Sequence, residues 1–314
     1  MIQRWPIGGA TKRGDASSLV ASRNHGDAGS LRFVTFLAPS LEPLYRFIAR
    51  FVGERLGCRT EFFVGSRYEE MLTDYDVGFI CGLAYVELDR QDGGLIEPLA
   101  APVLSGARYA GKPIYFSEVI VRRDSPFRTF HDLRGRSWSY NERYSQSGYG
   151  VTRYHLASNG EVNGYFCRLV DAGAHEVSIR LVCTGAVDAS AIDSHLLAVT
   201  MRDHPDLAEQ LRVIGTLGPS TIQPVVASRR LPEQVRGILR AAFEAIHTDP
   251  AAKVELSHAL VERWVPVSAD SYDDIRRMRD SVEAAGVGHW APNSREPCSA
   301  RPTARFGAPE TAET

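Results

Sequence analysis

The segment Ser145-Gln146-Ser147-Gly148-Tyr149-Gly150 has the residue types and spacing most suggestive of chemistry in this 314-residue sequence. It lies between a predicted strand, Ser137–Tyr140, and a helix predicted from about Gly148 to Ala157. At such a turn, free backbone N–H groups and the positive end of the helix dipole converge. Serine hydroxyls add donors, and a glycine lets the backbone approach a ligand closely. The pattern predicts an anion site that needs no lysine or arginine, and an ordinary serine-capped helix start is the alternative.

The same segment differs from the better-known phosphate motifs. It lacks the Gly-Lys-Ser/Thr of a P-loop, and the third glycine of a dinucleotide fingerprint is absent. The chain also has no G-x-S-x-G elbow and no H-E-x-x-H motif. We therefore predict a binding site without catalytic residues and without a cofactor.

Composition excludes several classes of protein. Hydrophobic residues make up 44% and charged residues 24%, which is typical of soluble globular proteins. The 36 Lys and Arg against 38 Asp and Glu give a formal net charge of -2, so no nucleic-acid partner is expected. No apolar run approaches the roughly 18 residues of a membrane helix, so no integral membrane segment is predicted.

The cysteines predict no metal site. All five are isolated in the sequence, with no C-x-x-C pair and no histidine at metal-ligand spacing. We expect free thiols at Cys58, Cys81, Cys167, Cys183 and Cys298.

Two blocks of alternating strands and helices are predicted, and they must position the residues of the segment Ser145–Gly150. In the first block, apolar runs typical of strands alternate with amphipathic helices, which predicts βαβ units and a parallel sheet with helices on both faces. Its predicted elements are strands at Leu31–Leu37, Phe62–Val64 and Val77–Cys81, with helices at Leu44–Leu56 and from about Leu83.

The second block has the same character. Its predicted elements are strands at Ile114–Arg122, Ser137–Tyr140, Phe166–Val170, Val187–Ile192 and Val213–Leu217, with helices at Gly148–Ala157, His175–Cys183 and from Asp206. After Pro219 come a strand, Val225–Ser228, and long helices around Pro232–His247 and Asp270–Ala285. Because these helices have no sheet of their own, we assign them to the first block.

This assignment predicts an α/β fold of two α/β lobes joined by a double-crossover hinge, with a cleft at the carboxyl ends of the strands. The expected divisions are a flexible leader at 1–30, lobe 1 at 31–112, lobe 2 at 113–224, a helical return to lobe 1 at 225–290, and a disordered tail at 291–314.

Several segments in this order resemble one known family, the PhnD-like phosphate, phosphite and phosphonate substrate-binding proteins of ABC importers. The resemblance extends over about Leu31–Val267. The segments that carry it are Gly111–Arg122, Asp124-Ser125-Pro126, Asp132–Gly135, Tyr140-Asn141, Ser145-x-Ser147-Gly148, Gly173–Glu176, Gly185–Ser194, and Leu217–Ser220 through Pro224 to Ala227-Ser228.

The resemblance implies a type 2 periplasmic-binding-protein fold and a set of ligand-binding residues. In the family the S-x-S-G turn holds the oxyanion, which assigns that role to Ser145, Gln146, Ser147 and Gly148. Many relatives have threonine where this sequence has Gln146, and the longer amide changes the volume of the pocket.

Four further residues are assigned by the resemblance, each with an alternative. Tyr85 is expected to offer its hydroxyl from lobe 1, or else to pack. His175 and Asp193 are expected to face the ligand's substituent or a protonated oxygen; otherwise His175 is a surface cap and Asp193 caps the next helix. Tyr115, at the hinge, either packs or lines the cleft.

The function expected from this resemblance is solute capture for an ABC importer. A small phosphorus oxyanion would bind in the interlobe cleft of a monomer, with an ABC permease as partner. The alternatives are a cytosolic sensor of the same ligands, or an enzyme on the same fold resembling chorismate dehydratase or the thiamine-pyrimidine synthases.

The location is open on the sequence alone. The longest apolar stretch of the leader, Leu19-Val20-Ala21, is too short for an export signal, so the chain as written is expected in the cytoplasm. A misplaced start codon would instead make the protein periplasmic or lipid-anchored.

Overall fold

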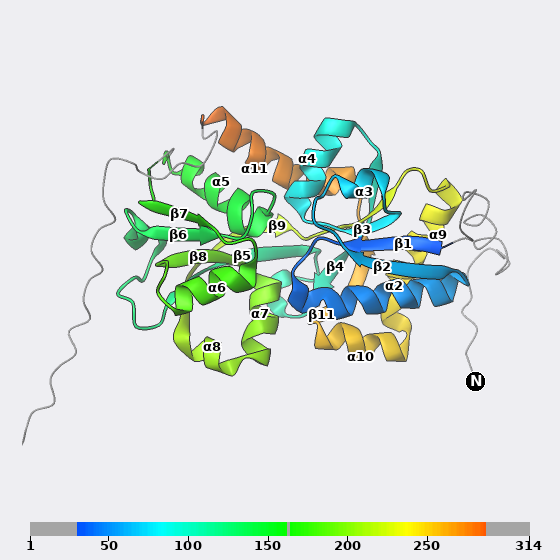
Figure 1. Cartoon of the computed structure of the whole chain (residues 1–314), viewed down its shortest axis with the longest axis horizontal. Helices are drawn as coiled ribbons and strands as arrows, with labels where there is room; N and C mark the ends of the chain where they lie inside the picture. The colour runs from blue at the N-terminus through cyan, green and yellow to red at the C-terminus, as the bar shows by residue number, and fades with distance from the viewer. Residues whose placement is uncertain (1–29, 162–163, 287–314) are drawn as a thin grey trace, which may run out of the picture. The chain divides into compact units, whose positions relative to one another are not determined.

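The computed structural model describes residues 30–161 and 164–286. The predicted tail at 291–314, and the predicted leader apart from Ser30, lie outside the described residues. The chain divides into two compact units, each with its own sheet (Figure 1). The described part of unit 1 comprises residues 30–115, Tyr144–Gln146 and Pro219–Arg277; that of unit 2 comprises residues 116–143, 147–161, 164–218 and 278–286.

Unit 1 contains a six-stranded sheet in the order β11-β4-β10-β3-β1-β2. Its strands are β1 (Ser30–Thr35), β2 (Arg59–Val64), β3 (Val77–Phe79), β4 (Ile96–Leu104), β10 (Val225–Ser228) and β11 (Val261–Pro266). Strand β1 runs parallel to β2 and β3, but β10 is antiparallel to both of its neighbours, β3 and β4. The expectation of a purely parallel sheet is therefore wrong, because a strand from late in the chain enters the middle of the sheet in the opposite direction.

The helices of unit 1 cover both faces of this sheet. Figure 1 shows α4 (Gly82–Asp92) on one side, and α2 (Glu42–Leu56) and α10 (Pro250–His258) on the other. Helix α2 contacts both α10 and α9 (Glu233–Ala245), and α9 also packs against β4 and β11. The short helix α3 (Glu70–Thr73) precedes β3, and α11 (Asp273–Ala284) ends the described chain.

Unit 2 contains a five-stranded sheet in the order β7-β6-β8-β5-β9. Its strands are β5 (Ile114–Arg122), β6 (Ser137–Tyr140), β7 (Arg168–Asp171), β8 (Ala189–Asp193) and β9 (Leu211–Thr221). This sheet is also mixed: β6 is parallel to β7 and β8, whereas β5 is antiparallel to β8.

The helices of unit 2 again lie on both sides of the sheet. Figure 1 shows α5 (Val151–Ser158) opposite α6 (His175–Cys183), α7 (Ser194–Asp203) and α8 (Pro205–Gln210). The side chain of Trp138 is fully buried and stacks on Phe166 with ring centroids 4.7 Å apart. Val151 and Leu156 of α5 belong to the same apolar cluster, so the helix that follows the candidate turn rests on a packed core.

Several predicted elements are found with the predicted bounds, and others were missed. The strands Ile114–Arg122, Ser137–Tyr140 and Val225–Ser228 and the helix His175–Cys183 are confirmed. Strand β4 contains Pro98 and Pro102, which argue against a strand in a sequence, yet both are paired in the sheet. Sequence reasoning also missed α7, α10 and β11.

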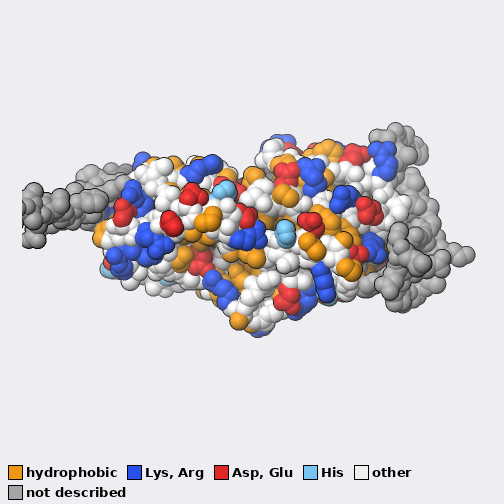
Figure 2. All heavy atoms as spheres, turned by 90° about the horizontal axis from the view of Figure 1, so that it is seen from below, with side chains coloured by type: hydrophobic (Ala, Val, Ile, Leu, Met, Phe, Trp, Pro, Cys, Tyr) orange, Lys and Arg blue, Asp and Glu red, His pale blue; other side chains and the backbone are white. Residues whose placement is uncertain are grey.

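The described surface carries charges of both signs. Figure 2 shows basic and acidic side chains interspersed over the face in view. No helix within residues 30–161 and 164–286 is long and apolar enough to cross a membrane. In that part of the chain no group of His, Cys, Asp and Glu side chains is arranged to hold a metal ion. Cys58, Cys81 and Cys183 are free thiols as predicted, whereas Cys167 is disulfide-bonded, so the prediction is wrong for that residue.

Candidate functional site

The serine turn forms a π-helical turn, Gln146–Gly150, that continues directly into α5. The regular helix thus begins at Val151 and not at Gly148 as predicted. Single π turns are often found at functional sites because they widen the backbone locally. Ser145, Gln146 and Ser147 are each at most 2% exposed, so their polar groups are withdrawn from water.

In unit 2, Ser147 of the turn contacts a histidine, His175. Ser147 Oγ lies 3.0 Å from Nε2 of His175, and both side chains are buried. His175 is the first residue of α6, and the preceding turn contains Gly173 at a φ of +75°, a conformation that glycine adopts without strain. Two helix starts, those of α5 and α6, therefore bring a hydroxyl and an imidazole into contact.

The surroundings of His175 disfavour the charged form of its ring. Burial lowers the pKa of His175, and the charges of Asp193 and Glu176 oppose this without outweighing it. Within the described residues, His175 Nδ1 is buried and has no hydrogen-bond partner. The ring thus presents one nitrogen to Ser147 and keeps the other open.

Gly148 lies where no side chain fits. A Cβ atom built on Gly148 would be 2.0 Å from Asn141 Oδ1, far inside any normal contact. Asn141 directly follows β6, and its Oδ1 atom is buried without a partner in the described part of the chain. The glycine is therefore required by a close approach between the turn and the end of β6.

Asp193 caps a helix. Its Oδ1 atom accepts hydrogen bonds from the backbone N–H groups of His195 at 2.7 Å and Leu196 at 3.2 Å, at the start of α7. This is the capping alternative that the sequence left open. The residue also lies at the carboxyl end of β8, opposite Ser117 of β5, and its charge acts on His175.

In unit 1 the turn is anchored through Gln146. Its backbone N–H donates to Cys81 Sγ at 3.2 Å, and its side-chain Nε2 donates to Ser220 Oγ at 3.1 Å. The side-chain amide that distinguishes this turn from its threonine-containing relatives is thus bound to the protein itself. Cys81 and Ser220 were given no role by sequence reasoning.

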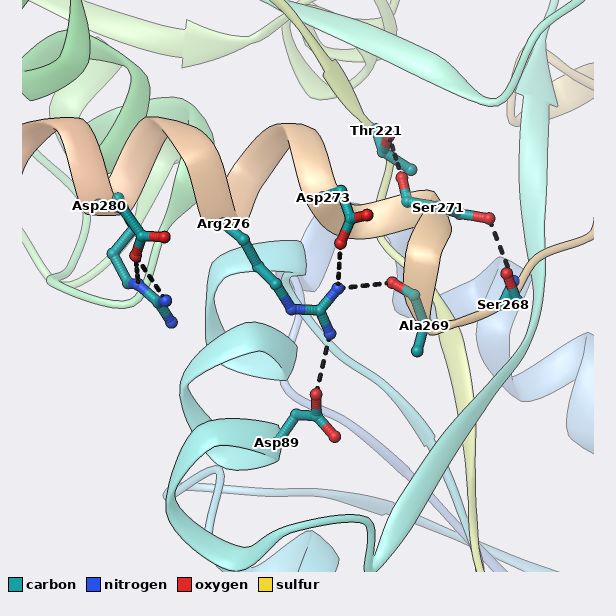
Figure 3. A network of polar contacts seen from close by, with 9 residues as sticks. Asp89, Thr221, Ser268, Ala269, Ser271, Asp273, Arg276 and Asp280 are labelled. Atoms are coloured by element: carbon teal, nitrogen blue, oxygen red, sulfur yellow. Dashed lines mark hydrogen bonds and ion pairs between the residues drawn. The ribbon is translucent and has the colours of Figure 1, made fainter.

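Tyr85 belongs to a structural cluster of unit 1. Its ring packs edge-on against Tyr272 at 5.1 Å between centroids, and its hydroxyl interacts with Arg276. Burial, assisted by the charge of Asp89, raises the pKa of Tyr85 to about 12. Figure 3 shows Arg276 donating to Ala269, Asp273 and Asp89, which ties α11 to α4. The alternative of packing is thereby favoured for Tyr85, whose contact with a ligand stays a prediction.

The predicted residues therefore fall into two groups. Unit 2 brings Ser147 and His175 into direct contact beside Gly148, with Asp193 near enough to act electrostatically. Ser145, Gln146 and Tyr85 belong to unit 1, as does Tyr115, which is 1% exposed. Asn141 was missed as a contributor, although its place directly after a buried strand of the sheet could have indicated it.

The fold is that of type 2 periplasmic binding proteins. A binding-protein component of an ABC phosphonate transporter from Pseudomonas aeruginosa matches with a TM-score of 0.72 and 19% identity, over 82% of this chain and 87% of that one. PhnD1 from Prochlorococcus marinus (MIT 9301), solved in complex with methylphosphonate, matches with a TM-score of 0.71 and 16% identity, over 81% and 98%. At these identities the likeness establishes the fold, and the predicted fold class is confirmed.

The sequence establishes the family. Residues 35–272 match the profile of the family described as "ABC transporter, phosphonate, periplasmic substrate-binding protein", and the chain belongs to that family. It is also 24% identical to the phosphonates-binding periplasmic protein of Escherichia coli (strain K12), over 79% of this chain and 74% of that protein. The predicted resemblance is confirmed, and the chain is a solute-binding protein and not an enzyme.

Proposed function

We propose that this protein captures a small phosphorus oxyanion, a phosphonate, phosphite or phosphate, at the turn Ser145–Gly148. The contact between Ser147 Oγ and His175 Nε2 is the observation that carries the proposal. A serine held by an imidazole has its hydroxyl oriented before the ligand arrives, so little entropy is lost when the hydroxyl binds an anion.

Three further properties of the turn favour an anion. The positive end of the α5 dipole and the backbone N–H groups of the preceding π turn attract negative charge. Gly148 leaves the turn without a side chain at the point of closest packing. His175 adds no net charge, so hydroxyls and backbone dipoles do the binding and a net charge of -2 is no obstacle.

Gln146 refines the proposed role of the turn. Because its side chain and its backbone N–H are bound by Ser220 and Cys81, we assign Gln146 to positioning the two serines. In the proposal Ser145 and Ser147 contact the ligand, and His175 supports Ser147. Tyr115 and Asp193 remain proposed members of the ligand's surroundings.

The proposed partner is an ABC permease that receives the ligand from a monomeric binding protein. Substrate-binding proteins of this family are components of ABC transporters, which supports the proposal. Size-exclusion chromatography with light scattering tests the monomer, and co-purification with a candidate permease tests the partner.

Calorimetry tests the ligand. Purified protein is titrated with phosphate, phosphite, methylphosphonate, 2-aminoethylphosphonate and sulfate. We expect binding of at least one phosphorus compound, and binding of none of the four would disprove the proposed function.

Ser147→Ala tests the site. Removing the hydroxyl leaves a ligand oxygen without its donor, and we expect affinity to fall by about 1–3 kcal/mol. Ser178→Ala is the matched control, because Ser178 is a fully buried serine of the same unit whose Oγ has no partner among the described residues. Equal losses in the two variants would place the site elsewhere.

A further inference from the structure

The loop that follows β5 in unit 2 brings guanidinium groups together; we call residues Arg123–Arg128 with Arg212 of β9 the arginine loop. Arg212 Nη2 donates to the carbonyl oxygens of Ser125 at 2.7 Å and Phe127 at 2.9 Å. Arg128 Nη1 donates to the same two oxygens, at 2.7 Å and 3.0 Å. Two groups of like charge therefore share one pair of acceptors, which holds them side by side.

A third guanidinium, that of Arg123, adds to this positive charge. Its Nε and Nη2 donate to the carbonyl oxygens of Glu209 at 2.6 Å and Ala208 at 2.8 Å, at the end of α8. Burial lowers the pKa of Arg212, and the charges of Arg128 and Arg123 lower it further. Three positive charges thus lie close enough to act on one another.

No carboxylate among the described residues accepts a hydrogen bond from these three guanidinium groups. The charge of Asp124 acts on Arg212, but the Asp124 carboxylate is paired with Arg122. Asp132 accepts from the backbone N–H of Arg128 at 2.8 Å and not from its guanidinium. The arginine loop therefore carries a local excess of positive charge on a protein whose formal net charge is -2.

Several donors of the arginine loop are open. Arg128 Nε and Nη2 and Arg123 Nη1 donate to no acceptor in the described part of the chain. Arg212 Nε and Ser125 Oγ are buried and also have no partner there. Buried polar atoms are nearly always paired in folded proteins, so the loop lacks a partner. Because the open groups are donors on a cluster of cations, the fitting partner is an anion.

We propose that the arginine loop is a second anion site, which binds a phosphate group through Arg123 and Arg128. The planar fork of arginine matches the oxygens of a phosphate, and a dianion offsets about two of the three charges where a carboxylate offsets one. Arg212 is a positioning residue, because its Nη atoms hold three carbonyl oxygens of the loop. A free phosphate and the phosphate of an anionic lipid headgroup offer the same chemistry.

The arginine loop is remote from the serine turn. Strand β5 is antiparallel to β8, with Ser117 opposite Asp193 and Val121 opposite Ala189. Asp193 is at the end of β8 where its charge acts on His175, whereas the arginine loop follows β5 at the end where β8 begins. The loop and His175 thus lie at opposite ends of the sheet of unit 2, and this inference does not depend on the proposed function.

Amide NMR tests the site. The wild-type protein is titrated with inorganic phosphate at low salt, with methylphosphonate in excess to occupy the turn Ser145–Gly148. We expect saturable shifts of the backbone amides of residues 123–128 and 212, and their loss at high salt, because salt screens exposed charges. Shifts confined to residues 145–150 would mean that phosphate binds at the serine turn alone and would overturn the inference.

Arg128→Gln removes a contact from an exposed position. The loop should stay folded, because Arg212 still donates to the two carbonyl oxygens that Arg128 shares with it. We expect the Kd for phosphate at the loop to rise about fivefold, and Arg128→Lys, which keeps the charge without the fork, to give a smaller rise. Arg202→Gln is the control, since it removes the same charge from a pair with Asp203 on α7. Equal rises in Arg128→Gln and Arg202→Gln would reveal an effect of net charge alone and refute the site.

Vesicle sedimentation separates the two sources of phosphate. The protein is mixed with vesicles of phosphatidylcholine, with or without phosphatidic acid. Sedimentation that requires phosphatidic acid and is weakened by Arg128→Gln identifies a lipid headgroup as the ligand. Amide shifts with inorganic phosphate, but no sedimentation, identify a soluble phosphate. If neither is observed the inference fails, while the proposed function is judged separately by calorimetry with methylphosphonate.

Discussion

Tyr85 in unit 1 and His175 in unit 2 are both buried, and both were predicted to contact the ligand. They differ in how completely the protein satisfies their polar atoms. The Tyr85 hydroxyl interacts with Arg276, whose guanidinium also reaches acceptors of α4 and α11. The His175 ring contacts Ser147 through one nitrogen and leaves the other unpartnered within the described residues.

The difference shows that burial of a polar side chain does not by itself indicate ligand binding. A buried group whose hydrogen bonds are complete stabilises the fold. An open buried atom can serve a ligand only where it lies at the site: His175 contacts Ser147 of the proposed site, whereas Ser178, whose Oγ is also open within the described residues, has no such contact. Substitutions in the tyrosine cluster should therefore change stability, and substitutions at the serine turn should change affinity.

The largest effect on affinity is expected from Gly148→Ala. The new methyl group would meet Asn141 Oδ1 at 2.0 Å and displace the turn, so affinity for methylphosphonate should fall by about 2–3 kcal/mol. Asn141→Ala in the same chain should restore part of this loss by removing the clash. Gly237→Ala is the control, because a Cβ there meets no atom within 4 Å. If Gly148→Ala binds methylphosphonate as tightly as the wild type, the ligand does not bind at this turn.

Arg276→Ala tests whether the tyrosine cluster of unit 1 contributes to stability and not to affinity. It removes hydrogen bonds to Asp89, Asp273 and Ala269, and we expect the free energy of unfolding to fall by about 1–2 kcal/mol at unchanged affinity. Arg90→Ala is the control, since Arg90 forms an exposed pair with Glu87 that contributes little. A parallel loss of affinity would show that the cluster belongs to the site.

The pH dependence of stability distinguishes the two regions further. Because the pKa of folded His175 is lowered, the unfolded chain binds a proton below about pH 6.5 that the folded protein does not bind. Its stabilising contribution is therefore complete above that pH and is lost progressively on acidification from pH 7 toward pH 5. Urea unfolding should show a smaller acid loss in His175→Gln than in the wild type. Identical losses would contradict the buried neutral ring.

The smallest effect is expected from Tyr85→Phe. The ring keeps its contact with Tyr272, and only the interaction with Arg276 is lost. We expect a loss of about 0.5 kcal/mol in unfolding free energy and no measurable change in affinity. If Tyr85→Phe instead binds the ligand tenfold more weakly than the wild type, Tyr85 contacts the ligand and is not purely structural.

Patterning of the sequence predicted the two blocks and the strands whose bounds depend on local residues. Val225–Ser228 is a short, largely apolar run, and Ser137–Tyr140 alternates serine with aromatic residues; both form strands inside their sheets. The direction of β10 was not predictable in this way, because an apolar run fits a parallel or an antiparallel neighbour equally well. That direction is set by where the chain re-enters unit 1.

The site was predictable as a set of residues but not as a geometry. The spacing of Ser145, Ser147 and Gly148 indicated an anion turn, and the family resemblance added His175. Neither indicated that Ser147 and His175 touch, that Gln146 is bound by Cys81 and Ser220, or that Asn141 fixes the need for glycine. The first two sets of contacts join segments far apart in the sequence, and the third depends on how the loop between Asn141 and Gly148 folds back, so local patterns carry no information about them.

The central position of β10 also determines the order in which the protein is assembled during synthesis. Strands β3 and β4 each have an open edge until Val225–Ser228 has left the ribosome, whereas the strands of unit 2, β5 to β9, all precede that segment. Domains fold as units while the chain emerges. The sheet whose first strand is made earliest is thus the last to be completed, and the edges of β3 and β4 stay open to pairing with other chains until then.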